Sequence, residues 1–184
     1  RGDHALLMSA KRAPNVRMHL VSNIFEKLVI DGQAYILTSQ RMKSGVDYEG
    51  FHYLEKFVYD DFDENAPMWT CQIADVTVTK HLQMAHGENK VALWYQIDNP
   101  LGKDVTLELL PLLRFTSKKE DFDVTQDLDT YKITSYDAGA KAEVQDGQHY
   151  ITDGDMKLFL ITNVDFALQQ AHLFGELYFS QDER

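Results

Sequence analysis

The alternation of apolar and polar residues constrains the fold of this chain more than any other feature of its sequence. In the segment KVALWYQI, one face of a predicted strand carries Val91, Leu93, Tyr95 and Ile97, and the other carries Lys90, Ala92, Trp94 and Gln96. A period of two is typical of a half-buried β-strand. Similar runs, among them IFEKLVI, MWTCQIA, DVTVTKHLQMA and VTLELLPLLRF, follow one another along most of the chain. The pattern predicts an all-β, antiparallel β-sandwich that forms a single domain over residues 1–184.

Two short segments predict hairpin turns between these strands. Asp31-Gly32 lies between two β-prone runs, which is a strong local signal for a hairpin. The second segment is His86-Gly87-Glu88-Asn89, in which Gly87 can adopt a positive φ and the two following side chains can bond turn amides. A turn does not need the imidazole of His86. This residue is therefore a candidate for contacting a sugar or another domain, with a purely structural turn as the alternative.

The charge of the chain limits its partners. Its 184 residues include 18 basic and 29 acidic side chains, which give a net charge of −11 without any basic stripe. This charge repels phosphate backbones and anionic lipids, so we expect no nucleic-acid or membrane partner, whereas neutral partners such as sugars are compatible with it. The single cysteine, Cys71, excludes an internal disulfide and fits a reducing compartment, so we expect a cytoplasmic protein.

The sequence contains no motif for a metal, a cofactor or catalysis. The acidic pairs in the predicted loops do not have the EF-hand spacing, and the seven histidines do not form an H-E-x-x-H pattern. No G-x-S-x-G elbow, P-loop or G-x-G-x-x-G segment occurs. We therefore expect no metal, no cofactor and no catalytic residue in this chain.

Aromatic residues are the main candidates for binding a neutral ligand, because they can stack on the apolar face of a sugar ring. The candidates of this kind are Trp69, Trp94, Tyr48, Tyr53, Tyr95 and Tyr131. A role in the core or on the sheet surface is the alternative for each. Trp94 falls on the strand face of Lys90 and Gln96, which we predict to be solvated.

Four segments carry a family resemblance. MAHGENKVALWYQID resembles M-V-H-G-E-N-T-V-V-V-R-Y-x-L in the N-terminal domain of bacterial and archaeal glycogen debranching enzymes of the amylo-α-1,6-glucosidase type. EGFHYLEKFVYDDF and VTLELLPLLRF are similar to two further motifs of that domain, in the same order. The first residues, RGDHALLMSAK, resemble T-R-x-Y-H-G-L-L-V-A, in which His4 matches the histidine while Asp3 and Ala5 depart from the pattern. LYFSQDER is similar to the segment that leads into the family's catalytic domain.

The resemblance implies a supersandwich related to the galactose-mutarotase-like fold. In the family this domain precedes a six-hairpin α/α barrel that carries the catalytic carboxylates and hydrolyses α-1,6-linked glucose at the branch stubs of glycogen. We therefore expect a fragment that lacks the first strands and the downstream barrel, and that has no catalytic activity of its own. The expected partners are the C-terminal α/α-barrel catalytic domain of the same polypeptide and an α-glucan. The candidate carbohydrate-binding residues are His4, His86, Glu88, Trp94, Trp69 and Tyr53.

Two other hypotheses remain open at this point. A free-standing mutarotase-like sugar epimerase needs a general acid and a general base across one pocket, for which His86, His52, Glu88 and Glu55 are available. A purely structural docking module is the other hypothesis. The apolar run HLFGELYF, residues 172–179, fits docking to another domain, in which case we expect the isolated fragment to self-associate through it. The alternative is that this run is simply the last strand of the sandwich.

Overall fold

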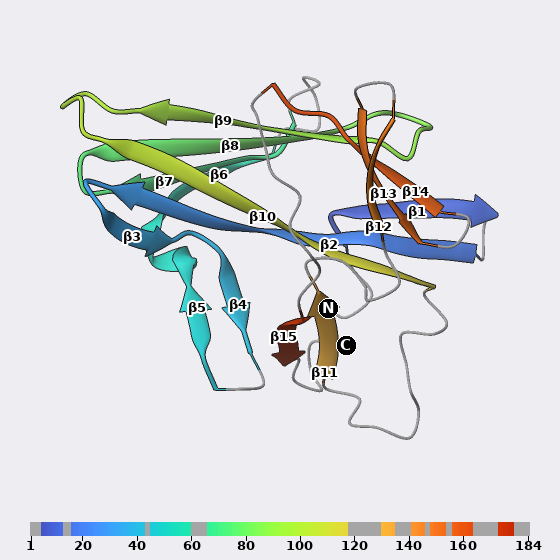
Figure 1. Ribbon diagram of the computed structural model, residues 1–184. Helices are drawn as coiled ribbons and strands as arrows, with labels where there is room; N and C mark the ends of the chain where they lie inside the picture. Colours follow the sequence, from blue (N-terminus) through green and yellow to red (C-terminus); the bar gives the residue numbers. More distant parts are fainter. Residues whose placement is uncertain are drawn as a thin grey trace. The chain divides into compact units, whose positions relative to one another are not determined.

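The described part of the chain is made of β-strands with one 3-10 turn, as the period-two pattern predicts (Figure 1). The computed structural model describes residues 5–12, 16–42, 45–59, 66–117, 130–134, 141–145, 148–153, 156–163 and 173–178. Every strand pair with a described register is antiparallel. The predicted fold class, an all-β antiparallel sandwich, is confirmed.

The chain divides into two compact units. Unit 1 comprises residues 1–23 and 111–184, and unit 2 comprises residues 24–110. The boundaries fall inside two long strands, β2 (Val16–Ile30) and β10 (Val105–Ser117), so each of these strands contributes residues to both units. The strand order of the sheet that contains them is β1-β2-β10-β11-β15, with β3 also paired to β2.

Unit 1 contains the outer strands of that sheet and a smaller sheet of the order β12-β13-β14. Its strands, besides the parts of β2 and β10, are β1 (Leu7–Arg12), β11 (Thr130–Thr134), β12 (Lys141–Gln145), β13 (Gln148–Asp153), β14 (Met156–Leu160) and β15 (Leu173–Tyr178). Its buried apolar residues include Leu7, Leu20, Val21, Leu112, Leu113, Tyr150, Ile151 and Leu158.

Unit 2 contains a four-stranded meander of the order β6-β7-β8-β9, whose strands lie side by side in Figure 1. The meander consists of β6 (Leu54–Val58), β7 (Met68–Ile73), β8 (Val76–Met84) and β9 (Val91–Asp98). Besides its parts of β2 and β10, the unit also contains β3 (Gln33–Ile36), the hairpin of β4 (Ser39–Arg41) and β5 (Asp47–Glu49), and the 3-10 turn η1 (Gly50–Tyr53).

The hairpin predicted at Asp31-Gly32 is confirmed. Strand β2 pairs with β3 across this turn, and both turn residues have positive φ values, 49° for Asp31 and 82° for Gly32. A two-residue turn of this conformation matches the twist of the strands that it joins. The Asp31 N–H donates to the carbonyl of Asp104 at 2.8 Å, and the Asp104 N–H donates to Asp31 Oδ1 at 3.1 Å. The turn is thus attached to the start of β10.

The turn predicted at His86 to Asn89 is also confirmed. It joins β8 to β9 after the pair Met84–Val91, and Gly87 has a φ of 74°. The Ala85 N–H donates to the carbonyl of Lys90 at 3.1 Å, which closes the loop. Gly87 therefore supplies the left-handed conformation that a residue with a Cβ adopts only at a cost.

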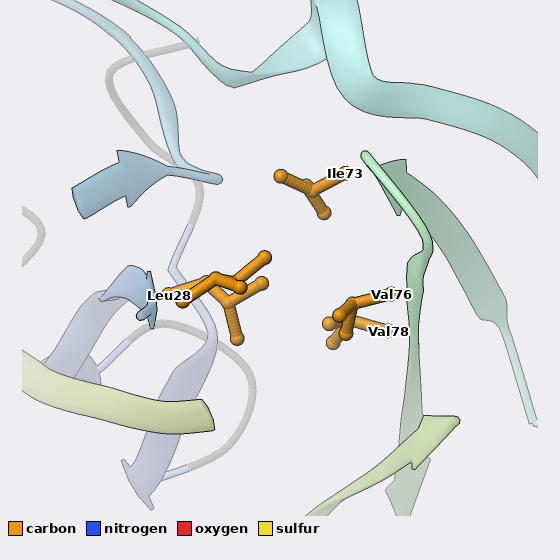
Figure 2. Packing of buried hydrophobic residues seen from close by; sticks show 5 residues of the cluster. Leu28, Ile73, Val76 and Val78 are labelled. Atoms are coloured by element: carbon orange, nitrogen blue, oxygen red, sulfur yellow. The ribbon is translucent and has the colours of Figure 1, made fainter. Parts of the chain in front are cut away.

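The core of unit 2 lies between two layers. Leu28 on β2 points toward Ile73, Val76 and Val78 on β7 and β8 (Figure 2). These side chains are at most 2% exposed, and Leu28 and Val76 are fully buried. Burying such side chains supplies about 1.5–3 kcal/mol each. Because alternate residues of a strand share a face, the next inward positions on β2 and β8 lie beside this core.

Candidate functional site

Three residues form a row across the meander of unit 2. Trp69 on β7 pairs with Lys80 on β8, and Lys80 pairs with Tyr95 on β9. Directly paired residues project from the same face of a sheet. Lys80 also lies two positions after Val78, a residue of the core, so this row continues the inward face.

Glu26 projects toward the same region from β2. It lies between Ile24 and Leu28 in the period-two pattern, both of which are buried, and its own side chain is 10% exposed. The Tyr95 hydroxyl donates to Glu26 Oε1 at 2.5 Å, and Lys80 Nζ contacts the same oxygen at 2.5 Å. One carboxylate oxygen therefore accepts from both a phenol and an ammonium group, and this type of hydrogen bond is the stronger kind.

The backbone around Glu26 is fixed by the segment that follows β3. The Glu26 N–H donates to Thr38 Oγ1 at 2.8 Å, and the Leu37 N–H donates to the carbonyl of Glu26 at 3.0 Å. These two bonds fix the backbone of β2 at the residue that carries the carboxylate.

The ion pair of Glu26 and Lys80 lies in the wall of a hollow of about 220 Å³. The hollow is lined by Glu26, Leu37, Ser39, Gly50, Phe51, Leu54, Trp69, Cys71, Val78, Lys80 and Tyr95, all of which belong to unit 2. Phe51 is 54% exposed and Leu54 is 41% exposed, so the hollow is accessible from solvent beside these two residues.

The environment raises the pKa of two groups in this wall. Burial, followed by the negative charge of Glu26 and the hydrogen bond to it, raises the pKa of the Tyr95 phenol. Burial and the charge of Glu26 also raise the pKa of the Cys71 thiol, against the opposing effect of Lys80. Tyr95 therefore stays a neutral donor at physiological pH, and Cys71 stays a protonated thiol.

We expect the Cys71 thiol to react slowly in the folded protein, because only the thiolate attacks an alkylating reagent. At pH 8 its rate with iodoacetamide should be well below the rate of the same chain unfolded in urea. The folded rate should continue to rise with pH beyond about 8.5, where an ordinary thiol titrates. If the folded protein were alkylated at the unfolded rate throughout this pH range, the pKa of the Cys71 thiol would not be raised by its surroundings.

Tyr95, one of the aromatic candidates from the sequence, lines the hollow, and of the six candidate carbohydrate-binding residues Trp69 does so. The ammonium group of Lys80 lies 5.7 Å from the centroid of its ring. Trp94 projects from the opposite face of the meander, where it is 43% exposed and stacks on His81 at 4.9 Å between ring centroids. That face is thus solvated, as predicted. Tyr53 lies in η1, packs against the core and contacts the ring of Tyr35 edge-on at 6.1 Å.

His86 and Glu88 do not line the hollow either. His86 and Glu88 are exposed in the turn between β8 and β9, and Glu88 pairs with Lys90 at 2.8 Å. The hydrogen bond to Lys90 lowers the pKa of the Glu88 carboxyl. His4 lies outside the described residues. The carbohydrate-binding roles of all six candidates stay predictions.

The structure does not gather the residues that an epimerase would need. His52 is exposed and pairs with Glu49 at 3.3 Å. Glu55 is exposed on β6, and neither it nor His52 lines the hollow. His86 and Glu88 lie in the turn after β8, so none of the four residues lines the hollow.

Two residues of this site, Glu26 and Lys80, were missed in the sequence. Each is a charged residue at a position where the period-two pattern calls for an apolar one, Glu26 in IFEKLVI and Lys80 in VTVTKHL. Opposite charges on two inward faces are a signal for a buried pair, because an unpaired buried charge is costly.

The described part of the chain holds no group of three or more His, Cys, Asp or Glu arranged to bind a metal ion. In the same part, no helix is long and apolar enough to span a membrane.

Comparison with known proteins agrees with the resemblance seen in the motifs. The model of the family described as glycogen debranching enzyme N terminal matches residues 1–184. No curated protein and no solved structure matches the chain significantly. Because the match covers the chain from its first residue to its last, this protein belongs to the family of glycogen debranching enzyme N-terminal domains.

Proposed function

We propose that this chain is the non-catalytic β-domain of a debranching α-1,6-glucosidase, and that it supports a catalytic α/α barrel in the same polypeptide and contacts the α-glucan substrate. The observation that carries this proposal is the family match over residues 1–184. The hydrolysis itself is assigned to the barrel.

The chemistry of the hollow supports a non-catalytic role. Glycoside hydrolysis generally uses two carboxyl groups, about 5–9.5 Å apart, on either side of the scissile bond. Among the described residues that line the hollow, Glu26 is the one carboxylate, and its Oε1 is bonded to Lys80 and Tyr95. Within this described lining, Glu26 has no second carboxylate with which to form an acid–base or nucleophile–acid pair.

Exposed apolar side chains support a role in contacting another domain or a ligand. Four large apolar side chains in η1, in β6 and directly after β6 are between 41% and 61% exposed: Phe51, Leu54, Phe57 and Tyr59. Concentrations of exposed apolar side chains commonly mark interaction surfaces. The side chains of the C-terminal run, residues 172–179, lie outside those described, so its role in docking or self-association stays a prediction.

Glucose release from a branched glucan tests this proposal. The purified chain should release no glucose from a glycogen limit dextrin that carries single-glucose α-1,6 stubs. The full-length product of the same gene should release glucose from this substrate and none from linear amylose. Release by the homogeneous chain would refute its non-catalytic role, and a full-length product inactive on the stubs would refute the assignment to a debranching glucosidase.

A further inference from the structure

The carboxylate of Glu26 has unused hydrogen-bonding capacity inside the hollow. Its Oε1 accepts from Lys80 and Tyr95, whereas its Oε2 has no polar partner among the described residues. A carboxylate offers about four acceptor positions, so Glu26 can accept further hydrogen bonds. Glu26 lines the hollow, so a molecule bound there can supply a partner for this oxygen.

The same wall also offers donors. The ammonium group of Lys80 has three N–H groups, and Glu26 is its one acceptor among the described residues. The Tyr95 oxygen donates its proton to Glu26 and keeps the capacity to accept. An acceptor and donors therefore lie next to each other, which suits a ligand whose neighbouring hydroxyl groups both donate and accept.

The charges favour a neutral ligand. Glu26 and Lys80 offset each other within the hollow, and the chain as a whole carries a net charge of −11. An anionic ligand would be repelled by the whole chain and by Glu26, and a cationic ligand would compete with Lys80 for the carboxylate.

Besides these polar groups, the lining offers an apolar surface formed by two aromatic residues. Trp69 and Phe51 belong to it, and Phe51 is more than half exposed although it is a large apolar side chain. Aromatic rings stack on apolar faces, and those of a pyranose ring consist of C–H groups. The hollow of about 220 Å³ is smaller than the roughly 300–1,000 Å³ of sites for drug-sized ligands, so it fits one ring rather than a chain of rings.

From these features we infer that the hollow of unit 2 is a subsite for one neutral hexopyranose unit of an α-glucan. Glu26 Oε2 and Lys80 Nζ bind its hydroxyl groups, and Trp69 and Phe51 contact its apolar face. The identification of the ring as part of an α-glucan rests on the proposed function, whereas the neutral sugar ring itself follows from the lining.

The two tryptophans of the chain provide a matched pair of probes, because Trp69 lines the hollow and Trp94 lies on the opposite face of the same sheet. In a Trp94→Phe variant, maltotriose should change the fluorescence of Trp69 in a saturable way. In a Trp69→Phe variant, it should leave the fluorescence of Trp94 unchanged. Cellotriose, with β-linked units, is the control for an α-glucan.

A second pair of variants tests the stacking contact without disturbing the core. Phe51→Ala should weaken maltotriose binding by about tenfold, which corresponds to the loss of one aromatic contact. Phe159→Ala is the control, because Phe159 is 53% exposed, close to the 54% of Phe51, and belongs to unit 1. It should bind like the unmodified chain.

The outcomes separate this inference from the proposed function. Binding of maltotriose with an unchanged Trp69 signal and an unaffected Phe51→Ala variant would overturn the subsite and leave glucan contact standing. Equal responses to maltotriose and cellotriose would retain the sugar subsite and overturn its assignment to an α-glucan. Absence of any binding would overturn both the subsite and the glucan contact. The proposed α-1,6-glucosidase activity of the full-length product would still be tested separately, by its release of glucose.

Discussion

Replacing Glu26 by alanine should lower the free energy of unfolding by about 3–5 kcal/mol, because it leaves the ammonium group of Lys80 charged and unpaired in a largely buried position. The side chains of Lys80 and Glu26 are 18% and 10% exposed, so water replaces little of the lost interaction. Urea unfolding followed by tryptophan fluorescence measures this change, since both tryptophans lie in unit 2.

Two controls identify the cause of that loss. The double variant Glu26→Leu, Lys80→Met replaces both charges by apolar groups and should recover most of the stability. Glu88→Ala removes a carboxylate from another Glu–Lys pair, in which the side chains are 58% and 66% exposed, and should leave the unfolding midpoint unchanged. A Glu26→Ala variant as stable as Glu88→Ala would show that the buried pair does not hold this region together.

Replacing Gly50 by alanine should also destabilise the protein strongly. A Cβ at this position would lie 2.0 Å from the carbonyl oxygen of Leu37 and 2.8 Å from the backbone nitrogen of Thr38. These are backbone atoms and cannot rotate away, so the segment between β3 and β4 has to move. We expect a cost of about 3 kcal/mol, at the upper end for overpacking, and a melting temperature lower by about 6–12 °C.

Gly45→Ala is the matched control for this variant. No atom lies within 4 Å of a Cβ at Gly45, but its φ of 83° is strained for alanine. That strain costs about 1 kcal/mol. Thermal melting should therefore rank the unmodified chain above Gly45→Ala, and Gly45→Ala well above Gly50→Ala. Equal melting temperatures for the two variants would contradict the close contact between Gly50 and Leu37.

The local features of the fold could be predicted because their causes are local. The turn at Asp31-Gly32 follows from the conformational preferences of two adjacent residues, and the solvated face of Trp94 follows from the alternation within one strand. In both cases, residues that are close in the sequence determine the feature.

The hollow could not be predicted in the same way, because its contacts join distant parts of the chain. Tyr95 and Glu26 are 69 positions apart. The alternation places each residue on an inward face, but it does not specify which inward faces meet. The contact of Gly50 with the backbone of Leu37 likewise depends on how η1 packs against the segment after β3. Nothing in the residues around Gly50 indicates that a Cβ would be excluded there.

The central claim, that this chain is a domain that contacts α-glucan, is tested most directly by native gel electrophoresis of the chain in the presence of glycogen. A domain that binds the polysaccharide is retarded, because the glycogen in the gel is effectively immobile. We predict that the chain migrates more slowly in a gel that contains glycogen than in a plain gel, and that a soluble β-linked glucan has no such effect. Equal mobility in all three gels, relative to a protein that does not bind sugars, would contradict the claim.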